Sequence, residues 1–203
     1  MATDDPAADR LIARLTKLLP DSSSFEDIVY RSSTPRYASE KDLLTGIGSQ
    51  HHGGRWNRIG IAVVYASLTP EVAMAETLAH NRYYGIALEE AMPRTFVAIH
   101  AKLSHVLDLT LGSNRKRLQV SLENILHADW REEVRAGRIP LTQLLGQAAT
   151  RVGLEGLIVP SAASVGGVNL VIIPENLGAG STLEIANKDR LYVQVTPAVL
   201  RAE

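Results

Sequence analysis

The sequence predicts a single-domain α+β fold in which mixed or antiparallel sheets are flanked by helices. The chain has 203 residues, of which 45% are hydrophobic and 21% are charged, and these values are typical of one globular domain with a sizeable core. Apolar segments of strand length are mixed with segments of helical periodicity, without the strict alternation that a doubly wound sheet requires.

The first predicted elements are a helix and a strand. Apolar residues recur at helical spacing and stop before a proline, which predicts an amphipathic helix. These residues are Leu11, Ile12, Leu15, Leu18 and Leu19. Residues 25–33 (FEDIVYRSS) predict a strand, and residues 34–60 are rich in glycine, serine, proline and polar groups. Loops of that length are uncommon in a compact domain unless they bind something, so we expect a long functional loop there.

An alternating strand and a capped helix follow. Residues 61–67 (IAVVYAS) predict a strand that places Ile61, Val63, Tyr65 and Ser67 on one face and the smaller intervening residues on the other. The threonine and proline that come next supply an N-cap and a first-turn residue for a helix that runs to about residue 80.

The rest of the chain is predicted to contain four more strands and two helices. Helical patterns run over about 117–136 and 141–152, and each stops at a glycine. The predicted strands are 94–103, 156–161, 168–174 and 190–197. The sequence contains no internal repeat and no low-complexity linker.

Composition excludes several classes of protein. Lys and Arg number 21 against 22 Asp and Glu, and the near-zero net charge argues against a nucleic-acid-binding surface. The densest basic run, residues 115–117, is short. The absence of cysteine excludes disulfides, thiolate metal sites and cysteine nucleophiles. The acidic first residues do not resemble a signal peptide, and no segment reaches the roughly 20 apolar residues of a transmembrane helix, so we expect a cytoplasmic protein.

The segment GGRWN (53–57) concentrates specialised groups. Its two glycines permit a positive φ or a close approach of the backbone to a ligand. Arg55 is a candidate phosphate-binding group, Trp56 a stacking wall, and Asn57 an orienting hydrogen bonder. The alternative is a β-turn around a buried tryptophan, and the spacing alone does not separate the two.

The preceding His51 and His52 do not predict a metal site. Adjacent side chains diverge, and no HxxxH or HxH pattern accompanies them.

Arg31 is a candidate anion-binding residue in the first strand. It alternates with Asp27 and Val29, so its side chain shares a face that is at least partly inward. A buried arginine needs an anion, and the planar guanidinium fork suits a diphosphate. The alternative is an edge-strand arginine in solvent.

Glu76 is the most informative single residue. On the helix that follows the alternating strand, it shares a stripe with Val72 and two alanines. A carboxylate among small apolar side chains is destabilising unless something pairs with it. The functional interpretation is a carboxylate aimed into a cleft, which Tyr65 and Ser67 would also line. The alternatives are a helix twisted enough to expose Glu76 and a structural pair with an arginine.

Two polar residues lie in or beside late apolar strands. Ser161 ends one strand and opens a turn rich in glycine, serine and alanine, without the GxSxG of a hydrolase elbow. Its hydroxyl is a candidate ligand for phosphate or ribose. Asn169 lies within an apolar strand and therefore needs a hydrogen-bond partner.

Together these segments resemble the RES domain, the toxin half of RES–Xre toxin–antitoxin modules, over residues 26–175. The matching segments are YR (30–31), GGRWN (53–57), VVYAS (63–67), AMAETL (73–78), LTQLLG (141–146), LIVPSA (157–162) and GVNLVIIP (167–174). On this resemblance we expect the RES domain at 25–175, an N-terminal helical extension at 1–24 and a C-terminal strand extension of the same domain at 176–203.

The resemblance implies a fold similar to the diphtheria-toxin type of ADP-ribosyltransferase, with NAD as substrate and no metal. Arg31 and Arg55 match the family's two active-site arginines, and Tyr65, Glu76 and Ser161 match its tyrosine, glutamate and late serine. We therefore expect catalytic roles for Glu76, Arg31 and Tyr65. The expected NAD-binding residues are Arg31, Arg55, Trp56, Asn57, Tyr65, Ser67 and Ser161.

The chemistry of NAD cleavage agrees with these residue types. Arginines give bidentate, charge-assisted hydrogen bonds to a diphosphate. Breaking the bond from ribose to nicotinamide builds positive charge on the ribose, which a fixed carboxylate such as Glu76 stabilises. Tyr65 is a candidate to stack on nicotinamide.

We therefore expect a toxin that consumes NAD and is masked by an Xre-type antitoxin, with a homodimer allowed within the complex. The sequence does not distinguish water, phosphate and a protein side chain as the acceptor of ADP-ribose. With a protein side chain as acceptor, the chain would be an ADP-ribosyltransferase toxin with a specific target. Two rival functions are a ribonuclease toxin that uses His51 or His52 with Arg55, and a noncatalytic nucleotide-binding module. The neutral net charge counts against the first, and the complete set of catalytic residues counts against the second.

Overall fold

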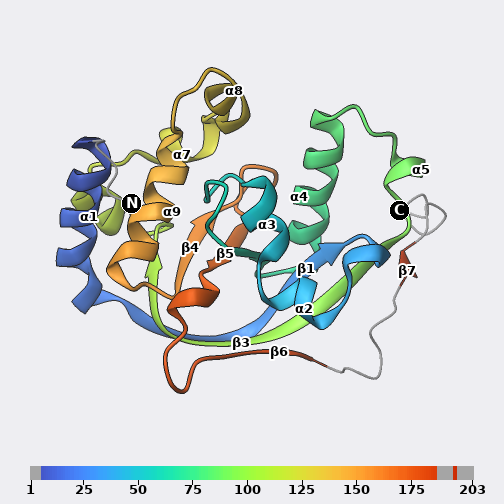
Figure 1. Cartoon of the computed structure of the whole chain (residues 1–203), viewed down its shortest axis with the longest axis horizontal. Helices are drawn as coiled ribbons and strands as arrows, with labels where there is room; N and C mark the ends of the chain where they lie inside the picture. Colours follow the sequence, from blue (N-terminus) through green and yellow to red (C-terminus); the bar gives the residue numbers. More distant parts are fainter. Residues whose placement is uncertain (1–5, 187–193, 196–203) are drawn as a thin grey trace.

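The computed structural model describes residues 6–186 and 194–195 and has an α+β architecture (Figure 1). Its helices are α1 (Pro6–Leu18), α2 (Glu40–Leu44), α3 (Ile47–His52), α4 (Pro70–Tyr83), α5 (Leu88–Ala91), α6 (Gly112–Leu118), α7 (Leu122–His127), α8 (Trp130–Arg135) and α9 (Leu141–Val152). Its strands are β1 (Ser23–Ser33), β2 (Val64–Ser67), β3 (Arg94–Asp108), β4 (Gly156–Pro160), β5 (Val168–Ile172), β6 (Thr182–Ile185) and β7 (Gln194–Val195). The predicted α+β class is confirmed.

The strands form one mixed sheet in which β3 is the longest element. β1 pairs antiparallel with β3 over most of its length and meets β2 at the pair Tyr30 and Ser67. β2, β5 and β4 follow with antiparallel pairing, and β4 runs parallel to β3. The hydrogen-bonded path through β1, β2, β5, β4 and β3 therefore closes on itself, while β6 and β7 pair with β3 outside that path.

Two apolar clusters lie on opposite faces of β2 and its neighbours. The first packs α1 and α9, which stand side by side in Figure 1, against β4, β5 and the residues around Val63 and Tyr65. The second joins β1 and β3 to β2 and β5 and includes Val64 and Ala66. This confirms the predicted alternation along β2, because its odd-numbered and even-numbered residues contribute to different clusters.

The predicted helix signals are confirmed at α4 and α9. The Thr69 hydroxyl accepts the backbone N–H of Val72 at 3.3 Å, and Pro70 is the first residue of α4. α9 ends at Gly153, whose φ of 86° is in the left-handed region that favours glycine. Since α4 continues to Tyr83, Glu76 lies at its middle rather than near its end.

Two predictions about local structure were wrong in part, and one strand was missed. The expected loop at 34–60 contains the short helices α2 and α3, which are too brief to show a hydrophobic period. The expected helix at 117–136 is three short helices, separated where Gln119 takes a φ of 58° and where Ser121 and Asp129 cap the next two helices. β6 was not expected, and only residues 194–195 of the expected strand at 190–197 lie within the described residues.

The N-terminal helix is built into the core. Leu11, Leu15 and Leu18 of α1 are at most 4% exposed and belong to the same cluster as α9. Among the helices that the structure describes, none has the length and apolar character needed to cross a membrane.

Candidate active site

The centre of the candidate site is the carboxylate of Glu76, on the inner face of α4. Its Oε1 atom accepts hydrogen bonds from Ser161 Oγ at 2.7 Å and from Asn169 Nδ2 at 2.7 Å. Ser67 Oγ in turn donates to Asn169 Oδ1 at 2.7 Å. The network thus draws together α4, the residue after β4, β5 and β2. No described residue donates a hydrogen bond to Oε2, so one carboxylate oxygen is held and the other is left for a ligand.

All the hydrogen bonds of the Ser161 hydroxyl are made within the protein, and its proton goes to this carboxylate. Its hydroxyl oxygen accepts the backbone N–H groups of Ala163 at 3.1 Å and Ser164 at 3.0 Å, and its proton is donated to Glu76. The residue is 5% exposed. The expectation that Ser161 binds phosphate or ribose is therefore replaced in this conformation by a role in holding Glu76.

Ser67 is likewise buried, at 4% exposure, with its hydroxyl turned toward Asn169. Sequence reasoning placed it on a cleft as an NAD-binding residue. In this structure it reaches the site only through the Asn169 amide. Asn169 was absent from the expected binding residues, although a polar residue in an apolar strand was correctly expected to need a partner.

Arg55 lies near Glu76 and is bonded to the backbone of α7. Its Nη2 donates to the carbonyls of Ile125 and Leu126, the latter at 2.9 Å. Burial lowers the pKa of Arg55, and the Glu76 carboxylate opposes that shift by favouring the charged guanidinium. The remaining guanidinium nitrogens are available to a ligand at the edge of the site.

Trp56 and Asn57 face the protein interior. Trp56 is 3% exposed and belongs to the core, and Asn57 is 0% exposed, with its Nδ2 donating to the carbonyls of Ser49 and Ile61, each at 2.8 Å. Their expected contact with NAD is not available in this conformation. The alternative noted from the sequence, a turn around a buried tryptophan, is what the structure contains, since Gly54 and Asn57 form a β-bridge.

Tyr65 holds this turn in place. Its hydroxyl donates to Asn57 Oδ1 at 2.7 Å and accepts the backbone N–H of Trp56 at 2.8 Å. Burial raises the pKa of Tyr65, so the phenol is neutral and serves as a fixed hydrogen-bonding group. Gly54 is required here because a Cβ at this position would lie 2.5 Å from the Tyr65 hydroxyl.

α9 supports the same turn from the other side. Gln143 Nε2 donates to the Gly54 carbonyl at 2.9 Å. A Cβ built on Gly146 would lie 1.7 Å from the Trp56 carbonyl oxygen, so only glycine allows this approach. The segment LTQLLG therefore acts on the site by positioning the turn that carries Arg55.

Arg31 is an inward-facing guanidinium, as its alternation with Val29 predicts. Its Nη1 donates to the Tyr65 carbonyl at 3.1 Å, and its Nε is buried without a hydrogen-bond partner. Burial lowers the pKa of Arg31, with Tyr65 opposing the shift and Arg94 adding to it. Among the described residues it has no carboxylate partner, so the charge is available to an anionic ligand.

Two further arginines and a histidine border the site and had no signal in the sequence. Arg94 of β3 lies near Arg31 and donates from Nε to Ser32 Oγ at 3.1 Å. Arg131 of α8 lies near Arg55, with its guanidinium 4.4 Å from the Tyr83 ring centroid and a 3.1 Å contact to His80 Nδ1. Burial lowers the pKa of His80, and Arg131 and Arg94 lower it further.

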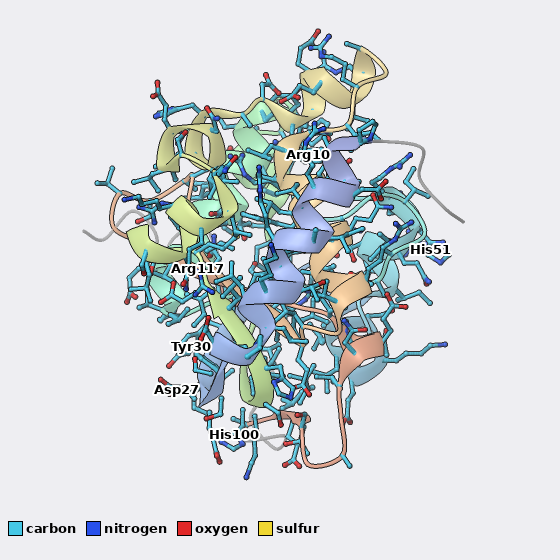
Figure 2. All side chains as sticks on the ribbon, turned by 90° about the vertical axis from the view of Figure 1, so that its left-hand side faces the viewer. Arg10, Asp27, Tyr30, His51, His100 and Arg117 are labelled. Atoms are coloured by element: carbon cyan, nitrogen blue, oxygen red, sulfur yellow. The ribbon has the colours of Figure 1, made fainter. Side chains whose placement is uncertain are left out.

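The two adjacent histidines that precede the GGRWN segment lie away from this site. His51 and His52 are exposed at the end of α3, and Figure 2 shows His51 at the outer surface. Among the described residues, no group of three or more His, Cys, Asp or Glu is placed to hold a metal ion. In the basic run at 115–117, two of the three side chains already have partners within the protein. Arg115 donates to the carbonyls of Leu109 and Thr110, and Arg117 pairs with Asp21 at 2.6 Å.

Comparison with known proteins identifies relatives and a shared fold. The family model for the RES domain matches residues 28–193. The chain is 32% identical over 145 residues to the Prs ADP-ribosylating toxin of Sphingobium sp., covering 71% of this chain and 81% of that toxin. It is 27% identical over 137 residues to the NAD(+) phosphorylase MbcT of Mycobacterium tuberculosis, covering 66% of this chain and 67% of that protein. The crystal structure of the M. tuberculosis MbcT–MbcA toxin–antitoxin complex matches the fold with a TM-score of 0.70 at 23% identity, over 98% of this chain and 96% of that chain.

Proposed function

The chain belongs to the RES domain family, and from this premise we propose that it is the toxin of a toxin–antitoxin system and consumes NAD by cleaving the bond between nicotinamide and ribose. One observation carries the proposal: a carboxylate held through one oxygen lies near Arg55, and neither Arg55 nor the buried Arg31 forms an ion pair with a carboxylate in the described chain. The relatives named as an NAD(+) phosphorylase and an ADP-ribosylating toxin support the same first step.

In this proposal Glu76 is the catalytic carboxylate. As the bond to nicotinamide lengthens, positive charge develops on the ribose, and a fixed negative charge nearby lowers the barrier. The Ser161 and Asn169 hydrogen bonds keep Glu76 in one orientation, so little reorganisation is needed during the reaction. The unpartnered Oε2 contacts the ribose.

Arg31 and Arg55 bind the diphosphate of NAD. A phosphate group suits both, because the planar guanidinium offers two parallel donors in a fixed geometry. Arg31 approaches from β1 and Arg55 from the turn that Tyr65 and α9 hold. Tyr65 contributes by fixing Arg31 through its carbonyl and the turn through its hydroxyl, and its ring lines the nicotinamide end.

We rank the candidate acceptors of the ADP-ribose in order of preference. NAD depletion with phosphate or water as acceptor comes first. Transfer to a specific protein is the second candidate, favoured by the 32% identity to a relative named as an ADP-ribosylating toxin. All three reactions share loss of nicotinamide, so the same carboxylate and arginines serve each of them.

We also propose a cytoplasmic location, a fold of the diphtheria-toxin ADP-ribosyltransferase type, and an Xre-type antitoxin partner that covers Glu76 and the arginines assigned to NAD. The structural relative crystallised as a toxin–antitoxin complex supports the partner. The guanidinium groups of Arg55, which lies near Glu76, and of Arg31 suit a masking segment that carries carboxylates.

The test is to incubate the purified chain with NAD and measure free nicotinamide, with and without inorganic phosphate. Free ADP-ribose identifies water as acceptor, a phosphorylated ADP-ribose identifies phosphate, and labelled protein in a cell extract identifies a side chain. Total RNA is a parallel substrate. Degradation of RNA without release of nicotinamide would overturn the proposal.

A further inference from the structure

The strand pair β2–β5 presents a second polar residue to the carboxylate besides Ser161. We infer that Asn169, oriented by Ser67, is a positioning residue for the reaction: it holds Glu76 through Oε1 and so directs Oε2 toward the substrate. This inference rests on the proposed function. It assigns Ser67 and Asn169 to the site through Glu76 rather than through contact with NAD.

The backbone fixes the two residues opposite each other. Ser67 and Asn169 are Cα partners in the antiparallel pairing of β2 with β5, and the next backbone bond along, from Leu68 N to the Val168 carbonyl, measures 3.0 Å. Directly opposed residues in such a pair have side chains close together on one face of the sheet. The 2.7 Å bond from Ser67 Oγ to Asn169 Oδ1 is therefore a product of strand register.

The Ser67 hydroxyl decides which way the amide points. A primary amide has an acceptor at one end and donors at the other. Because Ser67 donates to Oδ1, the Nδ2 group faces Glu76 and donates to Oε1 at 2.7 Å. The reversed amide would set Oδ1 against the carboxylate, with two acceptors in contact, so the carboxylate and the serine select the same orientation.

Both donors converge on one carboxylate oxygen. Ser161 and Asn169 each lie 2.7 Å from Oε1, and neither has another acceptor for the hydrogen that it gives to Glu76. Two bonds, one from β5 and one from the residue after β4, resist rotation of the carboxylate about its terminal torsion, which is otherwise soft. The consequence is an asymmetric group, with Oε1 saturated by the protein and Oε2 directed out of the network.

The charged side chains around this network lie on other elements. Arg55 is the cation that acts on Glu76, and Arg131 and Asp129 lie near Arg55 in turn. On the side of β1, Arg31 is bonded to the Tyr65 carbonyl. Substitutions at Ser67 or Asn169 leave these groups unchanged, so their effects report on the network.

The first experiment uses Asn169→Ala and Ser67→Ala in the full chain, with kcat and KM for NAD measured by nicotinamide release. We expect Asn169→Ala to lower kcat by about tenfold to a hundredfold, the effect of losing one hydrogen bond to a charged group, with KM within about twofold of wild type. Ser67→Ala keeps the donor but loses its orientation, so its kcat should fall by a smaller factor.

The matched control is Asn176→Ala. Asn176, like Asn169, donates from Nδ2, but its two acceptors are the carbonyls of Thr150 at 2.9 Å and Leu154 at 2.7 Å, at the end of α9. We expect this variant to lower the melting temperature and to leave kcat unchanged. A purely structural role for Asn169 predicts the same behaviour at both asparagines.

The decisive variant is Asn169→Asp, assayed across pH. At acidic pH the new carboxyl is protonated and can donate to Oε1, so its rate should approach that of wild type. As pH rises and the new carboxyl loses this proton, two carboxylates face and repel each other, and the rate should fall below that of Asn169→Ala. A structural role predicts no such pH dependence.

The outcomes distinguish failure of this inference from failure of the proposed function. Wild-type kcat and pH profile in all the Ser67 and Asn169 variants, with a wild-type chain that releases nicotinamide, would overturn this inference alone. A wild-type chain that releases no nicotinamide would overturn the proposed function and this inference together. If Asn169→Ala does not fold, Ser67→Ala carries the test, because it removes only one buried hydroxyl.

Discussion

Ser161 Oγ donates to Glu76 Oε1 at 2.7 Å, although the two residues are 85 positions apart in the chain. The bond joins the end of β4 to the middle of α4, and it leaves the opposite carboxylate oxygen without a described donor. This asymmetry tells which substitution of Glu76 preserves the structure, because a glutamine can keep an oxygen where Oε1 lies.

Glu76→Gln is therefore expected to retain the fold and lose most NAD turnover. The glutamine carbonyl can accept both the Ser161 and the Asn169 hydrogen bonds, while an uncharged amide replaces Oε2. Losing a charge partner of the transition state typically costs about 3 kcal/mol, or roughly a hundredfold in rate. Nicotinamide release and the melting temperature are the two measurements, and release close to the wild-type rate would rule Glu76 out as the catalytic carboxylate.

Arg31→Lys should weaken NAD use strongly even though the charge is kept. A lysine is a point charge and cannot donate to the Tyr65 carbonyl and to a diphosphate with the same geometry. We expect kcat/KM to fall by about tenfold or more, in line with the loss of a charged hydrogen bond. The steady-state kinetics of Arg31→Lys and Arg31→Ala provide the check. If both match wild type in activity and melting temperature, Arg31 has no role in binding.

Gly146→Ala should destabilise the protein through the turn that carries Arg55. The added Cβ would lie 1.7 Å from the Trp56 carbonyl oxygen, so α9 or the turn must move. Overpacking of this kind costs about 1–3 kcal/mol. Gly48→Ala is the matched control, because the same added atom meets nothing within 4 Å in helix α3 and should be neutral or stabilising. Urea unfolding midpoints compare the two, and equal midpoints would contradict the close approach.

The site residues that could be predicted from the sequence are those that interrupt an apolar pattern. A glutamate on an apolar helix stripe and an asparagine in an apolar strand both needed partners, and in the structure they are each other's partners. What the sequence could not tell was the direction in which the GGRWN turn faces. That direction depends on α9, where Gln143 donates to the Gly54 carbonyl and Gly146 allows the Trp56 backbone to approach closely.

The breaks between the short helices and the roles of Arg94 and Arg131 were also missed, because each depends on single residues or on distant neighbours. Residues 117–136 have helical composition throughout, so the breaks rest on single residues such as the caps Ser121 and Asp129. Arg94 reaches the site because β3 pairs with β1, and Arg131 because it stacks on Tyr83 of α4. Neither contact is encoded in the local sequence. Long, periodic elements such as α1 and α9 were predicted because their own sequence determines them.

Glu155 should make stability depend on pH. It is 2% exposed and accepts hydrogen bonds from Ser104 N at 2.6 Å, Gly178 N at 3.0 Å and Ser181 Oγ at 2.7 Å. Burial alone would raise the pKa of Glu155, but these bonds together hold it below its ordinary value. A lowered pKa in the folded state adds stability that is present above the ordinary carboxyl pKa and is lost as pH falls through the folded value.

Glu155→Gln is therefore expected to be less stable than wild type at neutral pH by about 1–3 kcal/mol. The difference should shrink as pH falls below the ordinary carboxyl range, where the wild-type group is protonated as well. Urea unfolding at neutral and acidic pH measures both free energies. A difference that stays constant across this range would show that the charge of Glu155 is not what these three donors stabilise.

The last prediction concerns the antitoxin. The guanidinium groups of Arg31 and Arg55 attract carboxylates as well as phosphates, so a masking segment that offers an acidic side chain should compete with NAD for them. Titrating antitoxin against nicotinamide release at several NAD concentrations should then give an apparent inhibition constant that rises with NAD. Arg55→Glu should weaken both ligands, whereas Arg58→Glu, the same charge reversal at an exposed position of the neighbouring sequence, should weaken neither. Because Arg55 also bonds the α7 backbone, the melting temperature of each variant is needed to separate lost binding from lost structure. An inhibition constant independent of NAD would place the antitoxin away from these guanidinium groups and rule out this form of masking.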